Sequence, residues 1–124
     1  MTVLVDSWAW IEYFKGTSHG EKAKEIIESG RQLLLSTVNV SEIYLFLLRN
    51  RASEAEKLMK FVLDSSFVIS LETSASLKAA KIKHSHKIGL ADAIVIATAE
   101  ENKAQILTGD DDFKHMKNVI YIGK

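Results

Sequence analysis

Residues 90–113 read LADAIVIATAEENKAQILTGDDDF and contain a helix and a strand on which the rest of the architecture depends. The segment from Leu90 to Lys103 is predicted to be a helix. Its middle, AIVIATA, is apolar on every side, which is typical of a central, buried helix. Gln105 to Thr108 follows as a short apolar strand that ends just before a run of acidic residues. This buried helix and the strand after it predict one unit of an α/β fold.

The same alternation runs through the rest of the chain. Further strands are predicted at 3–5, 32–36, 66–71 and 119–122. Further helices are predicted to begin at Ser7, about His19, Asn39, Ser53 and Thr73, and the last of them is predicted to run to Lys87. Ser53 and Glu56 form a capping-box pattern at the start of their helix. Strands that alternate with helices indicate a parallel sheet covered on both faces. We therefore expect one domain over residues 1–124, a helix-rich α/β/α sandwich with a central parallel sheet.

The composition excludes several classes of protein. Sixteen Lys and Arg balance sixteen Asp and Glu, which argues against binding nucleic acid through bulk charge. The absence of cysteine excludes a disulfide scaffold, Cys-ligated zinc and thiol catalysis. No apolar run approaches the roughly 18 residues of a membrane span, and the first residues lack a signal-peptide pattern. These features predict a cytoplasmic protein with no membrane attachment.

Four acidic residues fall where an open parallel sheet gathers its functional groups. Asp6 directly follows the first strand, and Glu42 is expected in the first turn of the helix after the second strand. Asp92 begins the apolar helix, and Asp110 follows the strand that ends at Thr108. Ligands bind beyond the carboxyl ends of such strands, so we expect these acids to share one edge. Clustered carboxylates are tolerated when a cation neutralises them, and oxygen-only ligands favour Mg²⁺ or Mn²⁺.

Each acid also has a simpler structural explanation. Asn39-x-x-Glu42 matches a capping box, in which Glu42 would hold the start of its own helix. Asp92 could complement a helix dipole, although it stands between apolar residues, where an unpartnered charge is costly. Asp6 could form a turn or cap a helix, and Asp111 fits a solvated loop. Together the four acids favour a metal site over four separate structural roles.

Four segments occur in a recognisable order: Val3–Ser7 (VLVDS), Ser36–Ile43 (STVNVSEI), Ala91–Ala99 (ADAIVIATA) and Leu107–Phe113 (LTGDDDF). The last two are the most distinctive. With this set the chain resembles the PIN-domain ribonucleases, and especially the small VapC-like toxins of type II toxin–antitoxin systems. The resemblance covers essentially the whole chain and implies the PIN-like α/β/α fold.

The resemblance also implies an activity, which is metal-dependent endoribonuclease cleavage of RNA phosphodiester bonds with Mg²⁺ or Mn²⁺. It implies four residues that bind the metal and carry the catalysis: Asp6, Glu42, Asp92 and Asp110. Asp112 would be a peripheral fifth metal ligand, and Thr108 would orient Asp110 through its hydroxyl. A cognate antitoxin protein and a second copy of the chain are the implied protein partners.

A basic stretch precedes Asp92 in the sequence. Lys81, Lys83 and Lys87 could contact RNA phosphates beside the acids. Alternatively, they form the solvated end of a helix, where lysine is favoured by the helix dipole.

The segment 40–48, VSEIYLFLL, is more apolar than one buried stripe of a helix requires. Its large side chains span most of a helical circumference: Tyr44, Phe46, Leu47 and Leu48. The surplus favours self-association as a homodimer. The alternative is a helix wedged between neighbours in a small core.

Two other functions compete with the nuclease hypothesis. A phosphoryl-accepting receiver domain shares the length, the α/β class and the use of Mg²⁺. Asp6 is followed by Ser7 rather than by a second acid, and no acceptor Asp ends the SFVISL segment, which disfavours this class. A non-catalytic protein-interaction module of the same fold is the main alternative, and the presence of all four acids favours the enzyme.

Overall fold

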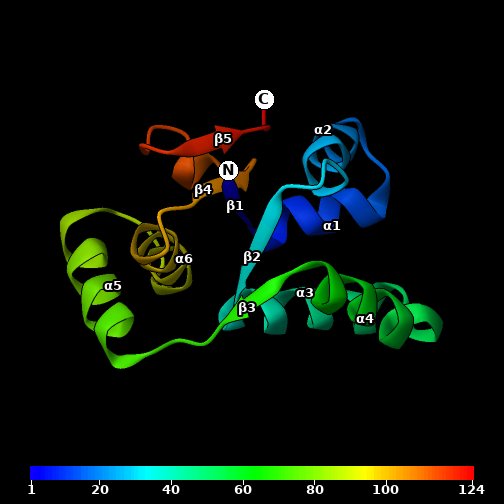
Figure 1. Cartoon of the computed structure of the whole chain (residues 1–124), viewed down its shortest axis with the longest axis horizontal. Coiled ribbons are helices and arrows are strands. Elements are labelled where there is room, and N and C mark those ends of the chain that lie inside the picture. The colour runs from blue at the N-terminus through cyan, green and yellow to red at the C-terminus, as the bar shows by residue number, and fades with distance from the viewer.

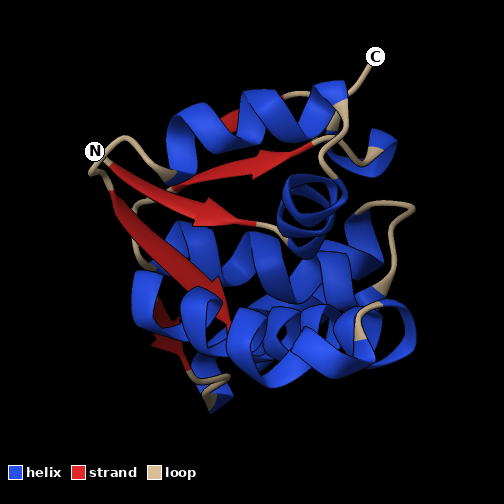
Figure 2. Cartoon of the chain, turned by 90° about the vertical axis from the view of Figure 1, so that its right-hand side faces the viewer, coloured by secondary structure: helices blue, strands red, loops and turns tan.

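The computed structural model describes all 124 residues and contains one five-stranded sheet. The strands are β1 (Thr2–Val5), β2 (Gln32–Ser36), β3 (Phe67–Ile69), β4 (Gln105–Thr108) and β5 (Val119–Tyr121). Their spatial order is β3-β2-β1-β4-β5, and every neighbouring pair is parallel. Figure 2 shows the arrows of the central strands pointing the same way. All five carboxyl ends therefore lie along one edge of the sheet.

Six helices cover the two faces of this sheet. They are α1 (Ser7–Lys15), α2 (Ser18–Ile27), α3 (Thr37–Asn50), α4 (Ala55–Ser65), α5 (Thr73–Ser85) and α6 (Leu90–Glu101). Two short 3₁₀ turns, η1 (Ala52–Glu54) and η2 (Asp111–Phe113), complete the chain. In Figure 1, α5 and α6 lie on one side of the strands and α1 to α4 on the other. The predicted α/β sandwich with a central parallel sheet is confirmed.

Both faces of the sheet are buried because its strands are apolar at successive positions. In β1, Val3 and Val5 face the core formed with α1 to α4, whereas Leu4 faces the core formed with α5 and α6. Leu33 and Leu35 of β2 alternate with Leu34 in the same way. Successive side chains of a strand point to opposite faces, so an uninterrupted apolar run fits a sheet that is covered on both sides.

The central helix α6 is the buried helix that its sequence predicts. Ala93 and the run Val95–Ala99 are buried, so most of its circumference contacts protein. At its carboxyl end the chain leaves the helix at Asn102, and Lys103 has a φ of 51°, in the left-handed region. The helix therefore stops two residues before its predicted end at Lys103.

Several predicted boundaries are wrong. Helix α3 begins at Thr37 rather than Asn39, because the Ser36 hydroxyl caps it by accepting the Val38 N–H at 3.3 Å. The capping box predicted from Ser53 does not form, since Ser53 lies in η1 and α4 begins after it without a side-chain cap.

Other differences are at element ends. Strand β3 is only Phe67–Ile69 and leaves Phe67 62% exposed at the edge of the sheet. Helix α5 ends at Ser85, two residues before the predicted Lys87.

No helix is both long enough and apolar enough to cross a membrane.

Candidate metal centre

The polar site lies at the carboxyl edge of the sheet, around its central strand. Asp6 directly follows β1, and Thr108 is the last residue of β4, which pairs with β1. Helix α3 follows β2, the other neighbour of β1, and carries Glu42. Crossover connections from adjacent parallel strands thus bring residues far apart in sequence to one point.

Asp6 is the most deeply buried of these acids, with only 4% of its surface exposed. Its Oδ2 accepts a hydrogen bond from the Thr108 hydroxyl at 2.9 Å, and its Oδ1 accepts one from Asn39 Nδ2 at 3.2 Å. Burial raises the pKa of Asp6 to about 6; the Thr108 hydrogen bond opposes this rise, and the charges of Glu42 and Asp110 add to it.

The Glu42 carboxylate belongs to this site and does not cap its helix. Because α3 begins at Thr37, Asn39 is its third residue and Glu42 lies in the second turn rather than the first. Glu42 Oε1 accepts hydrogen bonds from Ser7 Oγ at 2.6 Å and from Asn39 Nδ2 at 3.3 Å. The capping-box explanation of Asn39 and Glu42 is therefore wrong.

Three further carboxylates form a compact group. Asp92, Asp110 and Asp112 each place one carboxylate oxygen within 4.8 Å of the others. Asp92 is in the first turn of α6, Asp110 follows β4, and Asp112 lies in η2. The pKa of Asp92 is raised to about 7, first by burial and then by the charges of Asp110, Asp6 and Asp112. Asp6 therefore links the Glu42 side of the site electrostatically to this group.

Thr108 connects the two sides through hydrogen bonds. Its hydroxyl donates to Asp6 and accepts the main-chain N–H of Asp110 at 3.1 Å. The Asp110 carboxylate in turn accepts the main-chain N–H of Asp112 at 3.0 Å. The loop after β4 is thus held by hydrogen bonds between its own polar groups. The Thr108 hydroxyl is hydrogen-bonded to the Asp110 main chain and not to the Asp110 carboxylate.

The donor set fits a hard divalent cation. The compact group supplies only carboxylate oxygens, which Mg²⁺ and Mn²⁺ prefer, and contains no His or Cys. The pKa values of Asp6 and Asp92 are raised first by burial and in addition by the neighbouring carboxylates. A bound cation would relieve the repulsion between these carboxylates, because it favours the ionised form of every carboxylate around it.

Sequence reasoning does not identify Asn39 and Ser7 as members of this site. It places both residues at helix starts, where short polar side chains are common. The spacing of Asn39 and Glu42 was a usable signal, since residues three apart share one face of a helix.

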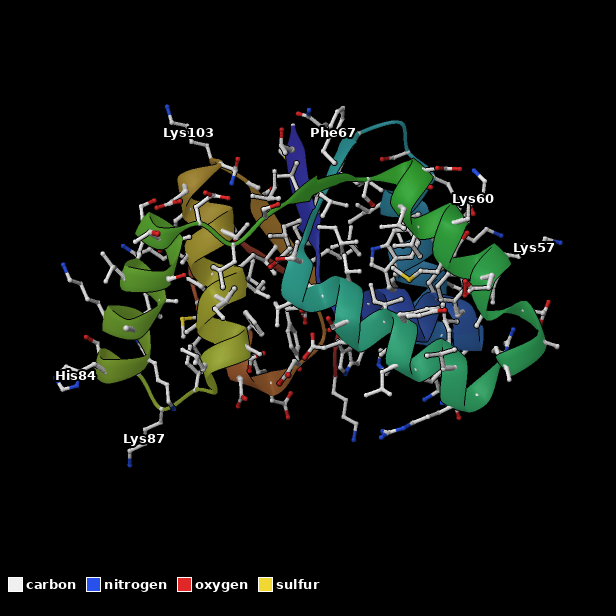
Figure 3. The ribbon with its side chains drawn as sticks, turned by 90° about the horizontal axis from the view of Figure 1, so that it is seen from below. Lys57, Lys60, Phe67, His84, Lys87 and Lys103 are labelled. Atoms are coloured by element: carbon white, nitrogen blue, oxygen red, sulfur yellow. The ribbon has the colours of Figure 1, made fainter.

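The basic residues proposed to contact RNA lie apart from the hydrogen-bond network of the acids. Lys81, Lys83 and Lys87 are exposed on α5 and the loop after it. Lys83 Nζ donates to the Ile88 carbonyl at 2.9 Å, and Figure 3 shows Lys87 pointing away from the ribbon. Their contact with RNA remains a prediction.

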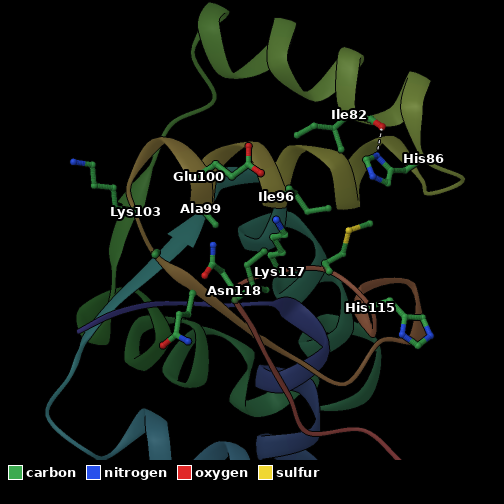
Figure 4. A pocket seen from close by; sticks show the side chains of 13 residues that line it. Ile82, His86, Ile96, Ala99, Glu100, Lys103, His115, Lys117 and Asn118 are labelled. Carbon is green, nitrogen blue, oxygen red and sulfur yellow. Dashed lines mark hydrogen bonds between the residues drawn. The ribbon is translucent and has the colours of Figure 1, made fainter.

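A cavity of about 670 Å³ lies elsewhere, at the opposite end of α6 from Asp92. It opens between α5, the last turns of α6 and the segment before β5 (Figure 4). Ile82, Ile96 and Ala99 form part of its wall, with Lys103 and Lys117 among its charged residues. None of the five acids lines it, so the acidic site is at the sheet edge rather than in this cavity.

The fold and the acidic edge together define a PIN-type α/β domain. The family model for the PIN domain matches residues 3–119, and the chain belongs to that family. No curated protein is significantly similar to it in sequence.

Its neighbours among solved structures are VapC and FitB toxins of toxin–antitoxin complexes. A toxin–antitoxin complex from Klebsiella pneumoniae matches with a TM-score of 0.83 and 21% identity, and the match covers 98% of each chain. VapC20 from Mycobacterium tuberculosis, described as a sarcin–ricin loop cleaving toxin, matches with a TM-score of 0.79 and 18% identity over 94% of this chain and 96% of that one. VapBC2 from Rickettsia felis, solved with a promoter DNA fragment, gives 0.76 and 13% over 98% and 97%. At these identities the likeness is one of fold.

Proposed function

We propose that this chain is a metal-dependent endoribonuclease and the toxin of a toxin–antitoxin pair. Membership of the PIN-domain family supports a nuclease. The observation that carries the proposal is the cluster of carboxylates from Asp92, Asp110 and Asp112 at the sheet edge. In this proposal Mg²⁺ or Mn²⁺ is held by the four acids that carry the catalysis: Asp6, Glu42, Asp92 and Asp110. Asp112 is a peripheral ligand.

Each part of the chain contributes a defined task. Thr108 donates a hydrogen bond to Asp6 and accepts one from the main chain of Asp110, so it connects the two segments that carry these carboxylates. When bound, the divalent ion supplies Lewis acidity and lowers the pKa of a water molecule. Lys81, Lys83 and Lys87 are proposed to contact the RNA backbone as exposed cations.

Purified protein is expected to cleave RNA internally with Mg²⁺ or Mn²⁺ and to leave it intact in EDTA. The acids present only oxygen ligands, so cleavage should depend on a divalent ion. The measurement is gel analysis of mixed RNAs incubated under the three conditions, with end-labelled RNA to separate internal cuts from trimming. A folded protein that leaves every RNA intact in both metals would instead support the non-catalytic interaction module.

An antitoxin partner is proposed because several neighbours of this fold were solved as toxin–antitoxin complexes. Such a partner and an RNA substrate would both meet the chain in the cytoplasm. Binding of the cognate antitoxin is expected to suppress RNA cleavage.

The packing of α3 leaves only part of its predicted apolar surface free for the proposed homodimer. Helix α3 contacts α1, α4, α6 and β2, so Leu47 is fully buried and Tyr44 and Phe46 pack against the core. The exposed apolar side chains of α3 are Leu45 and Leu48, each 46% exposed and three residues apart. We propose that this narrower face forms the dimer contact.

Leu48→Glu is therefore expected to convert a dimer into a monomer, because it places a charge in the proposed contact. Light scattering at micromolar concentration measures the mass. Leu77→Glu is the matched control, because Leu77 is also an exposed leucine on a helix, α5, outside the proposed contact. A wild-type monomer, or an unchanged dimer mass in Leu48→Glu, would reject this face.

A further inference from the structure

Asn39 places one amide group between two carboxylates from different parts of the chain. Its side chain is fully buried in the first turn of α3. Its Nδ2 lies 3.2 Å from Asp6 Oδ1, after β1, and 3.3 Å from Glu42 Oε1, on α3 itself. An amide nitrogen carries two hydrogens, so a single group can donate to both acids at once.

The orientation of this amide is set by the acids. Asn39 Oδ1 is buried and has no hydrogen-bond partner, which is unfavourable for a carbonyl oxygen. Turning the amide over would place this oxygen against two carboxylate oxygens and would remove the donor from both. The fold thus leaves one acceptor unpaired while both N–H groups face negative charge.

Ser7 supplies a second donor to the same glutamate. Its hydroxyl donates to Glu42 Oε1 at 2.6 Å and lies 3.5 Å from Asn39 Nδ2. Glu42 is otherwise on the exposed side of α3, where a glutamate samples many rotamers. Two donors on Oε1 fix the carboxylate, and Oε2 has no hydrogen bond within the chain.

We propose that Asn39, assisted by Ser7, is a positioning residue that holds Asp6 and Glu42 as a preformed pair of metal ligands; this inference rests on the proposed function. The two carboxylates lie close together, since one amide nitrogen contacts both, and like charges at that separation repel each other. N–H donors shared between them offset that repulsion and fix the geometry before an ion arrives.

The test measures Mn²⁺ affinity of the whole protein through the electron paramagnetic resonance signal of free Mn²⁺, alongside RNA cleavage. Asn39→Leu keeps a similar volume and removes both donors. It is expected to weaken Mn²⁺ binding by about 10–100-fold, the usual effect of removing a partner of a metal ligand. Cleavage should fall to the same extent at low Mn²⁺ and recover as the Mn²⁺ concentration is raised.

Ser36→Ala is the matched control, because Ser36 is also buried at the start of α3 and caps that helix outside the network. It is expected to lower Tm and to keep the wild-type Mn²⁺ affinity. If Asn39→Leu lowers Tm in the same way and keeps wild-type affinity, Asn39 only supports the helix and the inference is overturned. Should Asn39→Leu fail to fold, Asn39→Ser replaces it; its short hydroxyl cannot reach both acids, so wild-type affinity in that variant would overturn the inference too.

The wild-type protein separates this inference from the proposed function. Wild type that binds Mn²⁺ without cleaving any RNA rejects the nuclease, and the affinity ratio of Asn39→Leu to wild type still decides the role of Asn39. Wild type that binds and cleaves, beside an Asn39→Leu variant of equal affinity, rejects the positioning role alone. Wild type that binds no Mn²⁺ rejects both.

Discussion

Asp92→Asn is expected to lower RNA cleavage by at least roughly 100-fold, more than the loss of an outer partner of a metal ligand, and to raise Tm in EDTA. The loss follows from removing one of three carboxylates that lie within 4.8 Å of one another. The gain follows because burial and the charges of Asp110, Asp6 and Asp112 raise the pKa of Asp92 to about 7. A neutral side chain there removes both the desolvation and the repulsion in the metal-free protein.

The sign of the stability change separates a metal ligand from a dipole partner. If Asp92 only complemented the dipole of α6, the neutral variant would lose a favourable interaction and Tm would fall. Cleavage gels and thermal melts in EDTA measure the two effects on one preparation.

Asp111→Asn is the matched control, since Asp111 is an exposed acid next to Asp110 and Asp112 but outside their group. It is expected to keep wild-type cleavage. An Asp92→Asn variant that cleaves like wild type, or that loses activity together with a lower Tm, would contradict the assignment.

The parallel sheet was predictable because its signal is local. Val3–Val5 and Leu33–Leu35 are apolar at consecutive positions, which fits strands covered on both faces, and AIVIATA allows no solvent-facing side. Acids that directly follow such strands then fall at one edge by topology alone. The sequence alone therefore predicts that Asp6 and Asp110 lie at this edge, but it does not predict their hydrogen bonds.

The start of α3 shows where local reasoning stops. Ser36 and Asn39 both carry short polar side chains that can cap a helix, so the sequence does not choose between them. That choice decides whether Glu42 is in the first turn or the second, and with it whether Glu42 can be a capping residue. The deciding contact joins Asn39 to Asp6, 33 residues earlier, and depends on the folded chain.

Leu47 shows the same limit for surfaces. Helical spacing indicates that the apolar residues of α3 point in several directions, but not how many neighbours the helix has. Contacts with α1, α4, α6 and β2 bury Leu47 and leave Leu45 and Leu48 outside. An apolar surplus in a sequence therefore predicts burial or association, and only the packing separates them.

The metal-free protein is expected to lose stability as the pH rises, and Mg²⁺ is expected to reverse that loss. The pKa of Asp6 is raised from 3.8 to about 6 and that of Asp92 from 3.8 to about 7, mainly by burial. Between pH 4 and pH 7 the folded chain therefore holds more protons at these sites than the unfolded chain, so the free energy of unfolding decreases with pH. For Asp6 the shift corresponds to about 3 kcal/mol at neutral pH, at about 1.4 kcal/mol for each tenfold change in proton affinity.

The measurement is a set of thermal melts at about pH 5, about pH 6 and about pH 8, in EDTA and in millimolar Mg²⁺. In EDTA the higher Tm is expected at the lower pH. Mg²⁺ binds the ionised carboxylates, so its stabilising shift should be larger at the higher pH and should amount to about 2.7 kcal/mol at one hundred times Kd. Asp92→Asn serves as the control: it removes the group that titrates near pH 7, so its melts in EDTA should vary less between pH 6 and pH 8. The prediction fails if the wild-type Tm in EDTA rises from about pH 5 to about pH 8 and the Mg²⁺ shifts at these two pH values are equal. That result would mean that these carboxylates are neither crowded nor part of a cation site.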